Sequence, residues 1–233
     1  RLARRVVGEG DRALQGLVGA VLGPRLRDRL QFHVRRLAAE GAEVALHGRH
    51  LVERLAAAGL LEGMTAQVLL GRTYKVRKGT VVVVHAAAGG VGSILVQWAL
   101  HIGAHVIAVV GSDAKATTVR AMGCQDVLIH GRDDLAARVK ELTSGQGAHV
   151  VYDSVGKSTF FQSLDCLRRH GVMVSYGNAS GPVEPFSPLE LSTRGSLYLT
   201  RPVLWDFIAT RAELEAATGE LFDVLARGAV KVH

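Results

Sequence analysis

The chain has 233 residues, enough for one large domain or for one domain and a further segment. Hydrophobic residues make up 48% of it, as in ordinary globular proteins, and no apolar run approaches the ~20 residues that a membrane-spanning helix requires. The formal charge is +7, but the basic residues are spread along the chain and are not gathered into one basic helix with interleaved aromatics, which argues against a nucleic-acid-binding protein.

The first 62 residues differ in composition from the rest of the chain. Before Tyr74 the only aromatic residue is Phe32, and no lysine precedes Lys75. Amphipathic helical periodicity occurs at 28–40 and 49–62, so we expect residues 1–62 to be helical or poorly ordered. No chemistry is predicted there, and the origin of the segment stays open between a natural sequence and translation of a shifted reading frame.

After residue 62, short apolar runs alternate with segments of helical period. This rhythm is typical of repeated βα units around a parallel sheet. We expect strands at 81–85, 105–110, 126–129, 149–152, 172–176 and 196–200. Helices are expected at 90–102, 114–122, 134–143, 159–169 and 211–226. The sequence therefore predicts an α/β fold with a doubly wound parallel sheet of the Rossmann type over residues 63–233, preceded by the helical or poorly ordered N-terminal segment.

The two cysteines do not indicate a metal centre. Cys124 and Cys166 are far apart in the sequence, and neither has a His or Cys at metal-ligand spacing. We expect both to be small buried hydrophobic residues, and we predict no metal site. Nothing after Arg1 resembles the apolar core of a signal peptide, so we expect a cytoplasmic protein with no membrane contact.

A glycine-rich turn follows the first predicted strand. The spacing Ala87-x-Gly89-x-x-Gly92, between a buried strand and an apolar-faced helix, matches the dinucleotide-binding fingerprint with alanine in place of the first glycine. Without a Cβ, Gly89 and Gly90 would let the backbone turn sharply and bring a diphosphate to the amides at the positive end of the helix. Gly92 would let the helix pack closely on the strand. We infer a dinucleotide site, with a purely structural turn as the alternative.

The residues after the second strand select the nucleotide. An NAD site usually places an acid about 20 residues past the glycines, to bind the ribose hydroxyls. Gly111 and Ser112 occupy that place here, while Lys115 could donate hydrogen bonds to a 2′-phosphate. We therefore predict NADPH as the cofactor; the alternative for Lys115 is a solvated helix lysine. Asp113 lies slightly too late for a ribose ligand, and we interpret it as the helix N-cap.

Six segments in the order of the chain carry a family resemblance: 63–67, 85–92, 151–157, 163–167, 175–181 and 195–202. Together they resemble the zinc-independent medium-chain quinone oxidoreductases, the zeta-crystallin-like group, over about residues 63–233. The resemblance implies NADPH-dependent hydride transfer to quinones or related conjugated carbonyls such as enones. It also implies a homodimer built by pairing edge strands near 196–200. No protein nucleophile is needed, and no catalytic acid or base is assigned.

The resemblance implies a set of cofactor-binding residues, most of them in loops that follow strands. The pyrophosphate loop would be Ala88, Gly89, Gly90 and Val91, continuing to Gly92, and the 2′-phosphate side would be Gly111, Ser112, Lys115 and His130. The other contacts would be Thr65, Ser154, Tyr176, Gly177, Asn178, Thr200 and Arg201. From the residues alone, His130 could be an ordinary surface histidine. Arg201, next to the last predicted strand, could instead serve a dimer contact.

The chain also departs from the family pattern. Nothing in residues 1–62 matches the family's N-terminal barrel, which completes the quinone pocket, and family chains continue past the point where this one ends. We therefore expect a chain truncated at both ends. Three functions stay open: a working NADPH-dependent reductase, an NADPH-binding fragment without turnover, and an RNA-binding protein suggested by the positive charge.

Overall fold

A computed structural model describes residues 59–232 of the chain. The helix expected at 28–40, and all of the one expected at 49–62 except its last residues, lie outside the described residues. The chain divides into two compact units, Arg1–Leu61 and Glu62–His233. The second unit holds the predicted sheet.

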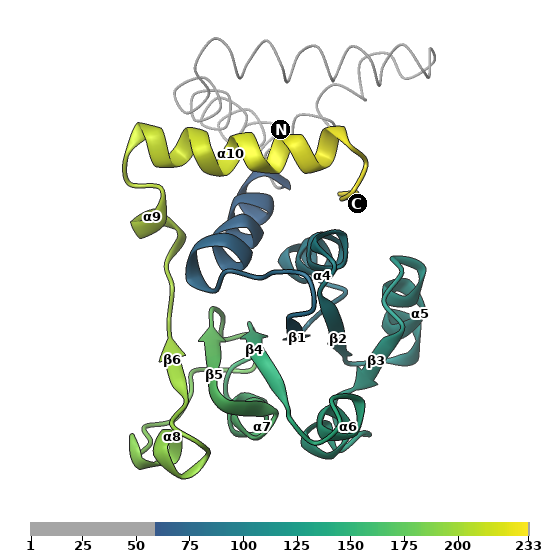
Figure 1. The fold of residues 1–233 in the computed structure, drawn as a ribbon, viewed down its shortest axis with the longest axis vertical. Helices are drawn as coiled ribbons and strands as arrows, with labels where there is room; N and C mark the ends of the chain where they lie inside the picture. Colours follow the sequence, from purple (N-terminus) through teal and green to yellow (C-terminus); the bar gives the residue numbers. More distant parts are fainter. Residues whose placement is uncertain (1–58, 233) are drawn as a thin grey trace, which may run out of the picture. The chain divides into compact units, whose positions relative to one another are not determined.

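The second unit is built on one parallel sheet of six strands (Figure 1). The strands are β1 (Val81–Val84), β2 (His105–Val110), β3 (Asp126–Ile129), β4 (Ala148–Asp153), β5 (Leu167–Ser175) and β6 (Tyr198–Thr200). Their order is β3-β2-β1-β4-β5-β6, and every neighbouring pair is parallel. The chain therefore adds β2 and β3 on one side of β1, and then β4, β5 and β6 on its other side. This confirms the predicted doubly wound α/β sheet.

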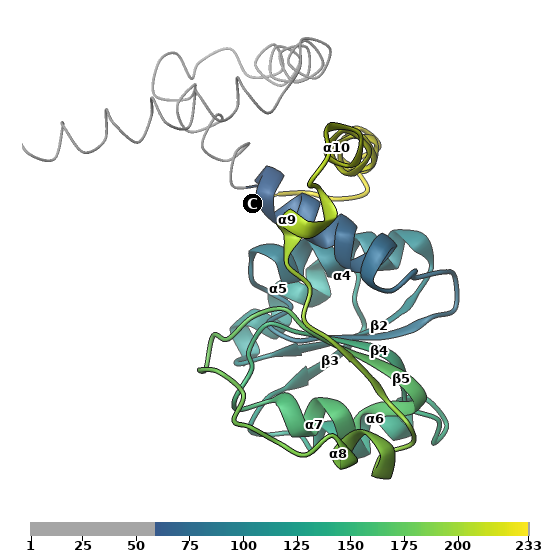
Figure 2. The ribbon, with the colours of Figure 1, turned by 90° about the vertical axis from the view of Figure 1, so that its left-hand side faces the viewer.

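Helices cover both faces of this sheet. They are α4 (Gly90–Ile102), α5 (Asp113–Ala121), α6 (Leu135–Leu142), α7 (Phe160–Asp165), α8 (Leu189–Thr193), α9 (Leu204–Phe207) and α10 (Arg211–Ala226), while helical residues 59–68 continue into the π-helix η1 (Leu69–Thr73). Figure 2 shows α4 and α5 on one face and α6, α7 and α8 on the other. None of the helices in residues 59–232 is long and apolar enough to span a membrane.

The central strands are continuous apolar runs because both of their faces are buried. Val82, Val83 and Val84 of β1 are fully buried, as is Val151 of the neighbouring β4. On the side of α6 and α7, the strands and helices share one hydrophobic core that includes Phe160. Full burial of one such side chain stabilises the fold by about 1.5–3 kcal/mol, so this core helps to hold the strand ends and their loops in place.

One predicted helix is wrong at its C-terminal end. The helix expected at 159–169 ends at Asp165, and residues 167–169 belong to β5. Leu167 pairs with Ala148 of β4, and the register then shifts before Val150. Hydrogen bonding to a neighbouring strand therefore outweighs the local helical pattern in this segment. The short helices α8 and α9 were not predicted.

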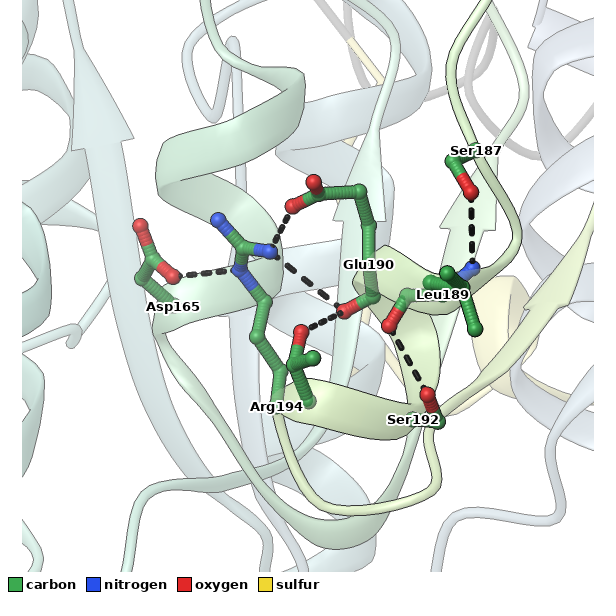
Figure 3. Close-up of polar contacts among 7 residues, drawn as sticks. Asp165, Ser187, Leu189, Glu190, Ser192 and Arg194 are labelled. Atoms are coloured by element: carbon green, nitrogen blue, oxygen red, sulfur yellow. Dashed lines mark hydrogen bonds and ion pairs between the residues drawn. The ribbon is translucent and has the colours of Figure 1, made fainter.

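Arg194 anchors the connection between β5 and β6 (Figure 3). Its Nε donates to Asp165 Oδ1 at 2.6 Å, and its Nη1 contacts the carboxylate of Glu190. The guanidinium carbon also lies 5.9 Å from the centre of the Phe161 ring, within cation–π range. Arg194 therefore ties α8 to α7 just before the chain enters β6, which leads to the last predicted site residues.

The two cysteines are free and buried, which confirms their interpretation as small hydrophobic residues. Burial raises the pKa of the Cys124 thiol to about 11 and that of the Cys166 thiol to about 12. Both therefore stay protonated near neutral pH and lack the thiolate character of a reactive cysteine.

Candidate functional site

The carboxyl ends of all six strands meet at one edge of the sheet because the strands are parallel. The predicted residues follow these ends: Ala88 to Gly92 after β1, Gly111 and Ser112 after β2, His130 after β3, Ser154 after β4, Tyr176 to Asn178 after β5, and Arg201 after β6, with Thr200 the last residue of β6. Lys115 lies in the first turn of α5, and Thr65 comes from the helical residues 59–68. The structure thus brings nearly all of the predicted residues to one edge.

The turn between β1 and α4 is fixed by its neighbours. The backbone amides of His85 and Ala87 donate to carbonyls of β4 and β2 at 2.9 and 3.1 Å. The left-handed residue of the turn is Ala86, with φ of 49°, whereas Gly89 is extended, with φ of −82°. The prediction that Gly89 and Gly90 supply the sharp turn is therefore wrong, because the alanine takes the strained conformation.

Gly92 is required for the packing of α4 against this turn. A Cβ added to Gly92 would lie 2.2 Å from the carbonyl oxygen of Ala86 and 3.0 Å from the Cα of Ala87. Both are backbone atoms of a segment tied to two strands, so neither can move aside without disturbing the sheet. This confirms the predicted close approach of helix and strand.

The first turn of α4 presents unoccupied backbone amides. Its N-cap, Gly89, offers no side-chain cap, and the turn contains no acidic residue. Ser93 N donates to Gly89 O at 2.8 Å, but no hydrogen bond within residues 59–232 occupies the amides of Gly90, Val91 or Gly92. Free amides at the positive end of a helix attract anions such as phosphate. The turn therefore has the donors that a diphosphate site needs.

The start of α5 differs from the prediction. Ser112, not Asp113, is the N-cap, and its Oγ accepts from Lys115 N at 3.4 Å. Asp113 is the first helical residue, and its Oδ1 lies 3.0 Å from Nη1 of Arg132. Serine caps a helix as well as aspartate does. Because Ser112 precedes Asp113 by one residue, it is the serine side chain that reaches the Lys115 amide. Arg132, a basic group in the loop after β3, was missed because no motif marks it.

His130 is partly buried at the same end of the sheet. Its backbone amide donates to Val110 O at 2.8 Å, which holds the residue beside the end of β2. Its Nδ1 is buried and has no hydrogen-bond partner among the described residues. A buried polar atom left unpaired costs about 1–3 kcal/mol, so His130 is not an ordinary exposed histidine.

A cavity of about 280 Å³ lies farther along the edge, lined by Thr65, Val68, Leu69, Tyr176, Arg201, Pro202, Val203 and Leu204. It brings together three predicted residues, Thr65, Tyr176 and Arg201. The hydroxyl of buried Tyr152 donates to the Leu69 carbonyl at 2.9 Å and so ties the π-helix to the sheet. The sequence did not predict the apolar residues of the lining, because 68–69 and 202–204 are far apart in the chain and come together only in the folded structure. A small, mostly apolar cavity with a few polar groups is typical of a ligand site.

The loops after β4, β5 and β6 hold one another in place beside this cavity. A Cβ added to Gly177 would lie 2.4 Å from the carbonyl oxygen of Ser154. Arg201 Nη1 donates to the carbonyls of Ser175 and Gly177, each at 3.0 Å. These hydrogen bonds tie the guanidinium of Arg201 to the end of β5 and the loop that follows it. Burial raises the pKa of Tyr176 to about 12, against an opposing hydrogen bond with Ser154. The Tyr176 phenol therefore stays neutral near pH 7 and can act as a hydrogen-bond donor.

A buried polar cluster beneath the edge was not predicted. The Asp153 carboxylate accepts from Thr159 Oγ1 at 2.7 Å, from Ser163 Oγ at 2.9 Å, and from two backbone amides of the following loop at 2.7 and 3.1 Å. His85 Nε2 lies 2.9 Å from Ser163 Oγ. Since the serine hydroxyl donates to Asp153, the histidine Nε2–H donates to the serine. These four side chains are at most 1% exposed.

This cluster has the residue types of a catalytic triad but the setting of a structural one. Burial, opposed by the nearby Asp153, lowers the pKa of His85, so its ring is neutral. The Ser163 hydroxyl gives its proton to a carboxylate and is closed off from any substrate. The cluster instead joins the ends of β1 and β4 to α7, and so it fixes the two loops that carry Ser154 and the glycine turn.

The fold and these loops match known proteins. The zinc-binding dehydrogenase family model matches residues 90–219. The chain is 49% identical over 177 residues to a quinone oxidoreductase of Salmonella typhimurium, covering 76% of this chain and 54% of that protein. It is 48% identical over 170 residues to a 2-haloacrylate reductase of a Burkholderia species, covering 72% of this chain and 51% of that protein. The solved structure of an Escherichia coli quinone oxidoreductase complexed with NADPH superposes with a TM-score of 0.74, at 46% identity, over 77% of this chain and 55% of that one.

The family name refers to zinc, yet the described residues do not fit a metal ion. Across residues 59–232, no three His, Cys, Asp or Glu side chains gather where they could hold one. The chain spans about half the length of the curated relatives it matches, 51% of one and 54% of another. The family model covers more than half of this chain. The chain therefore belongs to the zinc-binding dehydrogenase family.

Proposed function

We propose that this chain binds NADPH along the carboxyl edge of its sheet and forms the cofactor-binding part of an oxidoreductase that passes hydride to quinones or related conjugated carbonyls. The open amides of Gly90, Val91 and Gly92, where β1 lies beside β4 at the reversal of strand order, carry the proposal. It is supported by relatives named quinone oxidoreductase and 2-haloacrylate reductase, and by the NADPH complex of the Escherichia coli relative.

The residues fit such a cofactor in three stretches. The diphosphate would lie on the amides of the α4 first turn, and the 2′-phosphate beside Ser112 and Lys115, with His130 at the end of the neighbouring strand β3. The nicotinamide end would enter the cavity that Thr65 and Tyr176 line. When bound, the nicotinamide supplies the hydride. The chain's own residues orient it and exclude water, and this positioning lowers the barrier to hydride transfer.

Replacing Lys115 with alanine is expected to weaken NADPH binding about tenfold and to leave NADH binding within about twofold, because only NADPH carries the 2′-phosphate that this ammonium group would contact. Titrating both cofactors by tryptophan fluorescence checks this. Lys140→Ala is the matched control, since Lys140 is an exposed lysine on α6, on the other face of the sheet. Equal losses for both cofactors would refute the 2′-phosphate role of Lys115.

A cofactor-binding chain without turnover is the second candidate function. The observation that favours it is coverage, because the matched relatives are almost twice as long as the segment that aligns with them. Steady-state oxidation of NADPH with a simple quinone separates the two. Turnover would establish the reductase. NADPH binding at micromolar concentration without turnover would establish a chain that binds the cofactor but does not catalyse hydride transfer.

We also propose that the chain forms a homodimer through β6. This strand ends the sheet, and within the described residues its outer edge pairs with no other strand. Tyr198 and Leu199 on it are 63% and 37% exposed. An open edge with exposed apolar side chains favours strand pairing with a second copy. Analytical ultracentrifugation of Leu199→Lys beside the unaltered chain tests this, and a dimer that persists in the variant would contradict it.

A further inference from the structure

A carboxylate lies against the glycine turn, and the proposed function does not use it. Glu62 is 28 residues before Gly90 in the sequence, yet a Cβ added to Gly90 would lie 1.9 Å from its Oε1 and 2.6 Å from its Oε2. The carboxylate therefore touches the first residue of α4. Within residues 59–232, no hydrogen bond or ion pair involves this carboxylate, and Glu62 itself belongs to the helical residues 59–68.

The position of this carboxylate matters because of the charge it brings. The first turn of a helix carries roughly half a positive charge, which is what makes it attractive to an anion. The α4 first turn has no acidic residue of its own, so Glu62 is the acid that reaches it from another element. A full negative charge beside the open amides of Gly90 and Val91 opposes any second anion there. A dinucleotide's diphosphate brings further negative charge to the same place.

We propose that Glu62 lowers the affinity of the glycine turn for the diphosphate of NADPH, so that the cofactor binds only by displacing this carboxylate or by overcoming its repulsion. The inference rests on the proposed NADPH site and adds to it a residue that sets cofactor affinity. The effect is local. It acts on ligands that carry a diphosphate and not on groups that bind only at the Lys115 end of the sheet.

The test compares two substitutions at Glu62. Glu62→Gln keeps the size of the side chain and removes its charge, whereas Glu62→Ala removes both. NADPH and 2′-AMP, which carries the 2′-phosphate but no diphosphate, are titrated by calorimetry. Glu141→Gln, at an exposed residue of α6 on the other face of the sheet from α4, gives the same change in net charge away from the turn. We expect Glu62→Gln to tighten NADPH binding about tenfold, with 2′-AMP and the control unchanged.

The remaining outcomes each decide the question. If Glu62→Ala tightens NADPH binding and Glu62→Gln does not, the carboxylate acts by its bulk and the electrostatic role is refuted. If both substitutions leave NADPH binding unchanged or weaken it, the proposal fails while the NADPH site stands. If no variant binds NADPH and the unaltered chain does not either, the proposed function itself fails, and the role of Glu62 fails with it.

Discussion

Replacing Asp153 with alanine is expected to lower the free energy of unfolding by about 3–5 kcal/mol. The substitution removes an acceptor that four donors share and leaves the hydroxyls of Thr159 and Ser163 and two backbone amides without a partner in a fully buried site. Each buried donor left unpaired costs about 1–3 kcal/mol, partly offset by relaxation. Urea unfolding followed by circular dichroism measures the change, with the slope against urea compared between variants.

Asp223→Ala serves as the control for this prediction. Asp223 is exposed on α10, so its loss is expected to change stability by less than about 0.5 kcal/mol. Ser163→Ala provides an intermediate case, because it removes one donor to Asp153 and the acceptor of His85 while the other three bonds stay. A loss below about 1 kcal/mol in Asp153→Ala would contradict the view that this cluster fixes the loops of the site.

Gly92→Ala is expected to weaken NADPH binding by at least ~10-fold and to lower stability by about 1–3 kcal/mol. The added methyl group would meet the Ala86 carbonyl oxygen at 2.2 Å, so the turn or the helix must shift. Either shift moves the amides that would hold the diphosphate. Fluorescence titration with NADPH and thermal unfolding measure the two effects separately.

Gly219→Ala is the matched control, because it makes the same chemical change inside a helix. A Cβ at Gly219 would meet nothing within 4 Å, and the residue lies in α10. Alanine is favoured over glycine in a helix, so this variant is expected to gain about 0.5–1 kcal/mol and to bind NADPH normally. Unaltered affinity in Gly92→Ala would show that the close packing of α4 on the turn is not needed for binding.

The fold was predictable because its signals are local. The expected strands at 105–110 and 126–129 and the expected helices at 90–102 and 211–226 coincide with β2, β3, α4 and α10. In each of these segments the hydrophobic residues follow a single pattern, that of a strand or that of a helix, and turn residues mark both ends. The helix expected to reach 169 was wrong because Leu167 enters β5 and pairs with Ala148 of β4, and only the assembled sheet reveals that partner.

The site was predictable where a motif follows a strand and not where side chains converge from distant segments. The parallel sheet alone places the loops carrying Gly92, Lys115 and His130 at one edge. Asp153 and His85 meet through Ser163, and Glu62 reaches Gly90, only through tertiary packing. No spacing in the sequence encodes such contacts. The cytoplasmic location stays a prediction.

The most direct test of the central claim is an ¹⁵N NMR titration of the chain with NADPH. If the amides of Gly90, Val91 and Gly92 hold the diphosphate, their signals shift in a saturable manner and rank among the largest changes in the spectrum. The signal of Gly219, on α10, should stay in place. Saturable binding that leaves the three turn amides unshifted, or no saturable binding at all, would contradict the assignment of this turn as the dinucleotide site.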